Sequence, residues 1–314
     1  MRFDHAFDAG LTLGARVIVL HPGVGFALDF APNAHIITPD YMAFHHWQSA
    51  GFHVANQPSG TYDTAIVCVP RAKALAQDLV AQARACAPQV VVDGQKTDGV
   101  DSLCKSIRKR GVDVTAITKA HGRLFWFTGG DFTDWADNGR MVDGFHTKAG
   151  VFSADKIDRA SRLLLDHLPP TLAGDVADFG AGWGYLAKGV LGHAPEVKTL
   201  TLVEANKTAL DCARQNIDDP RAEFIWGDAT KPKGPFDCIV MNPPFHMGRA
   251  DRPELGQDFI KSAARSLRKT GQLWMVANRH LPYEHTLSEN FADFSCVYND
   301  AGFKVFHATR PRHK

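Results

Sequence analysis

The chain has few cysteines, no long apolar run and almost no net charge. Its six cysteines are spread over 314 residues without one Cys-x-x-Cys pair. We therefore expect no disulfide framework and no zinc site, and reduced thiols favour a cytoplasmic location. None of the 15 histidines stands at metal-ligand spacing, so no metal is expected. No apolar stretch approaches the length of a membrane span, and the first residues make a poor signal peptide. A net charge of +1 excludes a generic polycation, so a nucleic-acid partner would have to be met by local basic patches.

The length and the order of patterns predict two α/β domains. A chain of 314 residues is too long for one ordinary core. In the second half, short apolar runs alternate with helical patterns, which is typical of a doubly wound, mostly parallel sheet. The predicted strands are 176–179, 200–203, 224–226, 238–241 and 273–277. The predicted helices are 153–167, which Ser153 would cap, 185–191, 207–217 and 258–267. Residues 296–298 and 303–307 surround a turn sequence and predict an antiparallel edge hairpin.

The first half repeats this theme in degenerate form. Val17–Leu20 reads as a strand followed by a Gly-x-Gly turn. Residues 62–70 match 236–244 in register, since an aromatic-Asp pair opens both runs and a proline closes both. Cys68 then stands where Asn242 stands, and Thr38 stands where Glu204 would be expected. We interpret this as a duplication whose first copy has lost its chemistry. The expected domains are 1–145, the degenerate copy, and 150–314, the copy that keeps its chemistry.

The most informative motif is Asn242-Pro243-Pro244-Phe245, directly after a predicted buried strand. Two prolines stop the strand and fix the backbone at the sheet edge where open α/β sheets bind ligands. The amide oxygen of Asn242 and the Pro243 carbonyl could accept two N–H bonds from an exocyclic amine, while Phe245 stacks on its ring. These residues therefore predict methyl transfer to an amine attached to a nucleobase.

A glycine-rich turn and three carboxylates predict the cofactor. The run 178–184 follows one strand and opens a helix, and Gly180 and Gly182 let a ligand approach the backbone. Three acids, Asp178, Glu204 and Asp228, end consecutive strands. Carboxylates suit the positively charged amino acid end of S-adenosylmethionine (SAM), whereas they would repel the pyrophosphate of NAD. The pattern favours a SAM site at this edge.

Together these residues resemble class I SAM-dependent methyltransferases of the exocyclic-amine type. The whole chain is similar to the small-subunit rRNA (guanine-N2)-methyltransferase family, through residues 150–158, 242–246 and 277–284 and through its degenerate first half. The resemblance implies methylation of a guanine amine in ribosomal RNA, most plainly the 16S small-subunit rRNA. It also implies that residues 150–314 form the catalytic SAM-dependent domain, and that residues 1–145 form a degenerate methyltransferase-like domain that binds no SAM and aids folding or RNA docking. Phe179 and Trp183 make the glycine turn bulkier than is usual in that family.

The predicted substrate contacts follow from the same edge. Pro244 and Phe245 would hold the flipped base, and Arg249 and Arg279 would contact phosphate. The open alternatives are methylation of adenine N6 or of a protein glutamine, an NAD-linked oxidoreductase, and a non-enzymatic RNA-binding protein. The sequence does not give the oligomeric state, and a monomer is favoured.

Overall fold

The computed structural model describes residues 2–231, 233–244, 246–247, 250–251 and 253–312. The chain divides into two compact units, Met1–Gly139 and Arg140–Lys314, and each is described by itself. Among the described residues, no helix combines the length and the apolar character needed to cross a bilayer.

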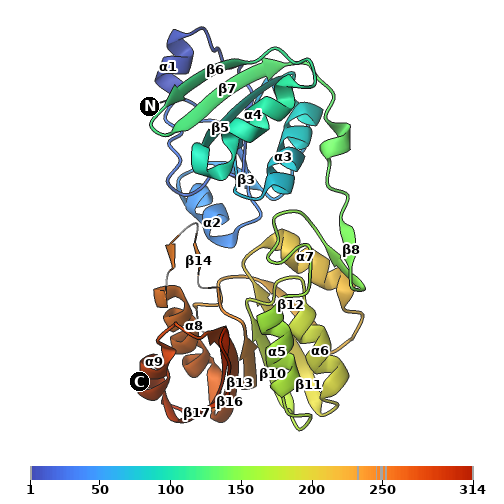
Figure 1. Ribbon diagram of the computed structural model, residues 1–314, viewed down its shortest axis with the longest axis vertical. Coiled ribbons are helices and arrows are strands. Elements are labelled where there is room, and N and C mark those ends of the chain that lie inside the picture. Colours follow the sequence, from blue (N-terminus) through green and yellow to red (C-terminus); the bar gives the residue numbers. More distant parts are fainter. Residues whose placement is uncertain (1, 232, 245, 248–249, 252, 313–314) are drawn as a thin grey trace. The chain divides into compact units, whose positions relative to one another are not determined.

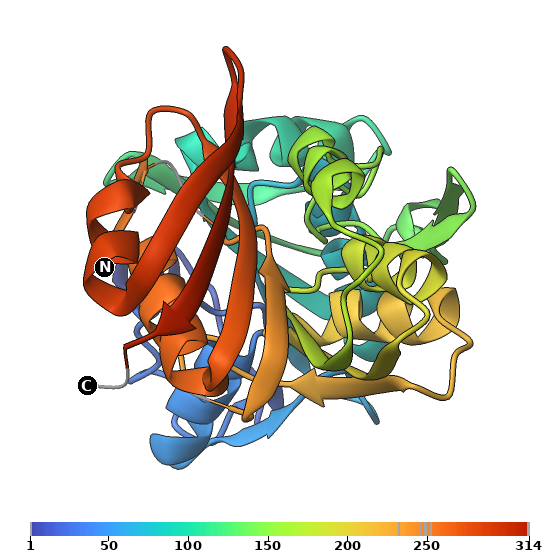
Figure 2. The same cartoon turned by 90° about the horizontal axis from the view of Figure 1, so that it is seen from below.

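The second unit is built on a seven-stranded sheet in the order β12-β11-β10-β13-β16-β18-β17. Pairing is parallel from β12 to β16 and antiparallel at β18 and β17, as predicted. Figure 2 shows the red β17–β18 hairpin along one edge of this sheet. The strands are β10 (Gly174–Phe179), β11 (Val197–Glu204), β12 (Ala222–Trp226), β13 (Phe236–Met241), β16 (Leu267–Asn278), β17 (Phe291–Asn299) and β18 (Phe303–Pro311).

Helices cover both faces of this sheet (Figure 1). Alternate strand residues point to opposite faces, so each strand contributes to two apolar clusters. One cluster joins Val176, Leu202 and Val240 to α5, α6 and α7, and the other joins Phe179, Ile239 and Met275 to α8 and α9. The helices are α5 (Arg159–His167), α6 (Tyr185–His193), α7 (Lys207–Asn216), α8 (Pro253–Ser266) and α9 (Tyr283–Asn290). Two small hairpins complete the described part of the unit: β8 (Arg140–Val142) with β9 (Phe145–Thr147), and β14 (His246–Met247) with β15 (Ala250–Asp251).

The start of α5 corrects one prediction. Ser153 does not cap a helix, because its φ is 52° and its hydroxyl donates to the Lys156 carbonyl at 2.7 Å. The helix begins at Arg159, and Asp158 is its N-cap, with a carboxylate oxygen that accepts from the Ser161 N–H at 2.8 Å. Serine and aspartate are both good N-caps, but the helix starts at Arg159 and its cap therefore lies five residues later than expected.

The first unit contains a second seven-stranded sheet, in the order β3-β2-β1-β4-β5-β7-β6. When the strands of each sheet are numbered in chain order, both sheets have the order 3-2-1-4-5-7-6. In both, the last two strands are antiparallel. Its elements are α1 (Arg2–Asp8), β1 (Val17–Leu20), β2 (His35–Ile37), α2 (Tyr41–Ser49), β3 (His53–Ala55), β4 (Thr64–Cys68), α3 (Lys73–Cys86), β5 (Gln89–Gln95), η1 (Lys96–Asp98), α4 (Val100–Arg108), β6 (Thr115–Lys119), β7 (Gly122–Thr128) and η2 (Thr133–Trp135).

The strand registers allow the two sheets to be compared position by position. Leu20 pairs with Ile37 and Val67 in the first sheet. Phe179 pairs with Val203 and Met241 in the second. The residues that follow these pairs are therefore equivalent: Thr38 matches Glu204 and Cys68 matches Asn242. One residue earlier, Val19 matches Asp178. The chemistry-bearing side chains of the second sheet edge have apolar or small counterparts in the first.

Candidate active site

The glycine turn after β10 gives the site its open backbone. Gly180, Gly182 and Gly184 all have positive φ, at 75°, 56° and 89°, which only glycine adopts without strain. A Cβ built on Gly182 meets nothing within 4 Å, whereas one on Gly184 would lie 2.9 Å from the Ile217 side chain. Gly182 therefore leaves space for a ligand, and Gly184 lets α6 pack closely against α7.

The two bulky residues of this turn are buried, and Trp183 lies in the wall of the pocket beside the turn. Phe179 is fully buried on the α8 side of the sheet. Trp183 is 4% exposed, donates its indole N–H to the Phe152 carbonyl at 2.9 Å and packs against Phe145. Neither ring blocks the turn, so their size does not close the site.

Asp178 lies beneath the turn with its carboxyl wholly buried. Among the described residues, neither of its oxygens has a hydrogen-bond partner of normal geometry, although the Ala187 backbone lies close enough to favour the ionised form. Burial, helped by the negative charge of Glu204, raises the pKa of Asp178 to about 8, and the Ala187 backbone offsets this only in part. A buried acid without a partner is costly and is the mark of a site that awaits a cation.

Glu204 and Asp228 end the next two strands of this sheet. The Glu204 carboxylate accepts from the backbone N–H of Gly182 at 2.8 Å and of Asn206 at 2.7 Å. One Asp228 oxygen accepts from the backbone and the hydroxyl of Thr230 at 2.8 and 2.6 Å. Both acids thus brace the loops of the predicted cofactor edge, and both remain half-buried rather than enclosed.

Asn242 shares one pocket with the glycine turn. The pocket is lined by Phe152, Ser153, Asp158, Ser161, Gly180, Ala181, Gly182, Trp183, Tyr185, Leu186 and Asn242. The pocket is partly open, and its cavity volume is about 40 Å³. The structure therefore brings together the two motifs on which the sequence prediction depends.

The side-chain amide of Asn242 is held by residues that the sequence prediction missed. Its Nδ2 atom donates to the Asp158 carboxylate at 3.0 Å and to the Ser161 hydroxyl at 2.9 Å. Both acceptors lie at the start of α5, over 80 residues away in sequence. The sequence signal that could have identified them is the Asp-x-x-Ser pattern at residues 158–161, which is typical of a helix N-cap.

The predicted substrate residues are only partly described. Pro243 is buried and Pro244 is exposed, with its ring carbon Cδ 4.0 Å from a Cβ built on Gly180. Arg279 is exposed just past the end of β16, and its backbone N–H donates to Gly302. Phe245 and Arg249 lie outside the described residues, so their predicted roles stay predictions.

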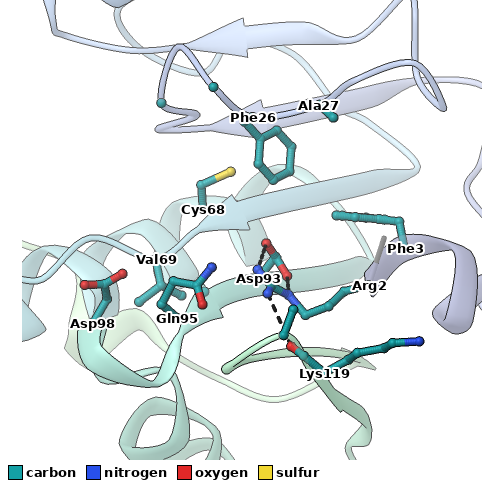
Figure 3. A pocket seen from close by; sticks show the side chains of 14 residues that line it. Arg2, Phe3, Phe26, Ala27, Cys68, Val69, Asp93, Gln95, Asp98 and Lys119 are labelled. Atoms are coloured by element: carbon teal, nitrogen blue, oxygen red, sulfur yellow. Dashed lines mark hydrogen bonds and ion pairs between the residues drawn. The ribbon is translucent and has the colours of Figure 1, made fainter.

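The equivalent edge of the first unit holds a different set of groups. A pocket of about 660 Å³ lies past the ends of β4 and β5. Arg2 reaches into it from α1 and pairs with Asp93 at 2.6 and 2.9 Å, next to Cys68 (Figure 3). The first unit thus has an Arg2–Asp93 ion pair on β5, beside Cys68, which is the counterpart of Asn242.

Comparison with known proteins decides the family. The methyltransferase small domain model matches residues 143–307. Ribosomal RNA small subunit methyltransferase C from Shewanella halifaxensis is 31% identical over 306 residues, which cover 90% of this chain and 86% of that protein. The protein of the same name from Salmonella paratyphi B is 31% identical, over 86% of this chain and 85% of its own length. The chain belongs to the ribosomal RNA small subunit methyltransferase C family.

A solved structure of this family has the same two-unit fold. It is the T. thermophilus 16S rRNA N2 methyltransferase (RsmC), in complex with AdoMet and guanosine, with a TM-score of 0.82 and 25% identity. The match covers 98% of this chain and 91% of that one. The predicted fold class and the resemblance drawn from the sequence are both confirmed. Within the described ranges, no group of three or more His, Cys, Asp or Glu side chains could hold a metal ion.

Proposed function

We propose that the second unit transfers a methyl group from SAM to the exocyclic N2 amine of a guanine in small-subunit ribosomal RNA. The observation that carries the proposal is the Asn242 amide, which lies in one pocket with the glycine turn and is held at its nitrogen end. The names of the relatives and of the T. thermophilus complex support the choice of substrate. A single chain carries the whole site, so a cytoplasmic monomer is sufficient.

The residues at the sheet edge fit SAM. Asp178 is a buried carboxyl without a partner among the described residues, and its ionised form would be favoured by a cation bound at the turn. Gly182 has empty space where a Cβ would lie, and Glu204 and Asp228 present carboxylates at the neighbouring strand ends. When bound, SAM supplies the activated methyl group.

The groups of this chain would act on the amine. An amine on a base is a poor nucleophile, because its lone pair is conjugated into the ring. The Asn242 Oδ1 atom and the Pro243 carbonyl would accept its two N–H bonds, which favours a pyramidal nitrogen and stabilises its developing positive charge. Pro244 and Arg279 would contact the base and the RNA backbone, and Phe245 and Arg249 have the same assignment from sequence alone.

The first unit is proposed to bind no SAM and to serve RNA docking or folding. Val19, Thr38 and Cys68 stand where the second unit has Asp178, Glu204 and Asn242.

The Asn242→Ala variant tests the proposed reaction. Loss of the acceptor should lower kcat by about 100-fold or more, while the affinity for SAM falls much less. Turnover would be followed with labelled SAM and unmodified 16S rRNA, and the methylated guanine mapped by mass spectrometry. Asn299→Ala, on the exposed edge hairpin, is the matched control. Turnover like that of the parent protein in Asn242→Ala would refute the mechanism.

A further inference from the structure

Both N–H bonds of the Asn242 amide are already used inside the protein. Asp158 accepts one at 3.0 Å and Ser161 accepts the other at 2.9 Å. An amide nitrogen has two donors, so none is left over. No described residue donates to the Oδ1 atom, and all three side chains line the pocket of the glycine turn.

We propose that Asp158 and Ser161 are positioning residues that fix the Asn242 amide with its oxygen toward the target amine. This inference rests on the proposed function, and it adds which residues decide whether the amide presents an acceptor or a donor to the substrate. The two ends of an amide have nearly the same shape, so a half-turn about the last side-chain bond exchanges acceptor for donor. A carboxylate can only accept, and Asp158 therefore allows one orientation.

The fixed orientation selects the chemistry of the substrate. With Oδ1 outward, the site accepts an N–H donor. A carbonyl oxygen at the same place on a base would face the lone pairs of Oδ1 and would be rejected. If the amide were free to turn, it would offer an N–H and bind such a carbonyl equally well. Asp158 and Ser161 thus give the site its preference for exocyclic amines over exocyclic carbonyls.

Asp158 also caps α5, because the same oxygen accepts from the backbone N–H of Ser161 at 2.8 Å. Asp158→Ala would therefore damage the helix as well as the site and would decide nothing. Asparagine caps a helix about as well as aspartate. An exchange of the two residue types keeps the cap and separates the two roles.

The test is the reciprocal exchange Asp158→Asn with Asn242→Asp in the full chain. Asn242→Asp alone places two carboxylates in contact and should lower kcat by about 100-fold. In the double variant, the amide introduced at position 158 can donate to one oxygen of the carboxylate introduced at position 242, and the other oxygen remains as the outward acceptor. We expect the double variant to recover at least about tenfold over Asn242→Asp, with SAM affinity measured by calorimetry unchanged between them. Asp166→Asn, exposed on the same helix, is the control.

The outcomes are separable. Recovery in the double variant supports the positioning role, since a purely structural cap would be indifferent to the residue at 242. Kinetics of Asn242→Asp like those of the parent, or a double variant no better than Asn242→Asp while both bind SAM, would overturn it. Failure of the parent protein to methylate 16S rRNA would instead overturn the proposed function. In that case, amide hydrogen exchange by NMR still decides the orientation: slow exchange of the Asn242 side-chain protons that becomes fast in Ser161→Ala supports it, and fast exchange in the parent refutes it.

Discussion

Asp178→Asn should make the second unit more stable, and the gain should grow with pH. The carboxyl has no hydrogen-bond partner among the described residues, and its pKa is raised from 3.8 to about 8 by burial and by Glu204. Between these two values the unfolded chain has lost a proton that the folded protein retains. The free energy of unfolding therefore falls as pH rises through this window, at up to about 1.4 kcal/mol per pH unit.

The magnitude follows from the width of that window. About four pH units separate the two states, which corresponds to a total loss on the order of 5 kcal/mol that is complete above pH 8. Asparagine carries no such penalty. A buried amide without partners has its own cost, but that cost does not depend on pH. The informative quantity is thus how the difference in the free energy of unfolding between variant and parent changes with pH. The absolute value of that difference at one pH is not informative.

The assay is urea denaturation of ligand-free protein at pH 5, 6.5 and 8, with Asp166→Asn as the exposed control on α5. The difference in the free energy of unfolding between Asp178→Asn and the parent should widen from pH 5 to pH 8 and then stay constant. A difference that is flat across this range would show that Asp178 is ionised in the folded protein, and the interpretation of an unpartnered acid would be wrong.

Three further predictions concern the same edge. Gly184→Ala should lower the free energy of unfolding by about 2–4 kcal/mol, because the positive φ of Gly184 and a Cβ only 2.9 Å from Ile217 both oppose an alanine. Gly182→Ala has open space around its Cβ, so it should weaken SAM binding with a smaller loss of stability. Equal losses of stability for the two variants in denaturation would contradict this. SAM affinity should rise several-fold from pH 6 to pH 8 with release of a proton, since a bound cation favours ionised Asp178. Calorimetry in buffers of different ionisation enthalpy measures the proton release, and its absence would count against this prediction. The same titration on the full chain should give one SAM per chain, and a stoichiometry of two would show that the first unit binds SAM after all.

Much of the second unit could be predicted from its sequence, because buried parallel strands are short apolar runs with clear ends. The apolar run 238–241 lies within β13 (Phe236–Met241), and the predicted edge hairpin is present as β17 and β18. The predicted start of α5 was wrong because Ser153 and Asp158 are both good caps, and only tertiary contacts select between them. The local pattern favours neither, whereas the bond from Asn242 to Asp158 spans 84 residues.

The parts of the site that could not be predicted from the sequence are those that depend on burial and on distant partners. The sequence places Asp178 at a strand end, yet it does not show that no donor among the described residues reaches its carboxyl. The pair between Arg2 and Asp93 joins residues 91 apart and lines a pocket that the sequence does not predict. Such contacts follow from the packing of whole elements, so a linear pattern does not contain them.

The saturation of the Asn242 nitrogen has a practical consequence for inhibitor chemistry. Since both N–H groups are already bonded to Asp158 and Ser161, a compound aimed at this spot has only an oxygen to address. Aminopyrimidine or amidine fragments offer the required hydrogens, whereas ketone or ether fragments bring a second set of lone pairs against the first. A fragment screen against this protein should therefore be enriched in N–H donors from the outset.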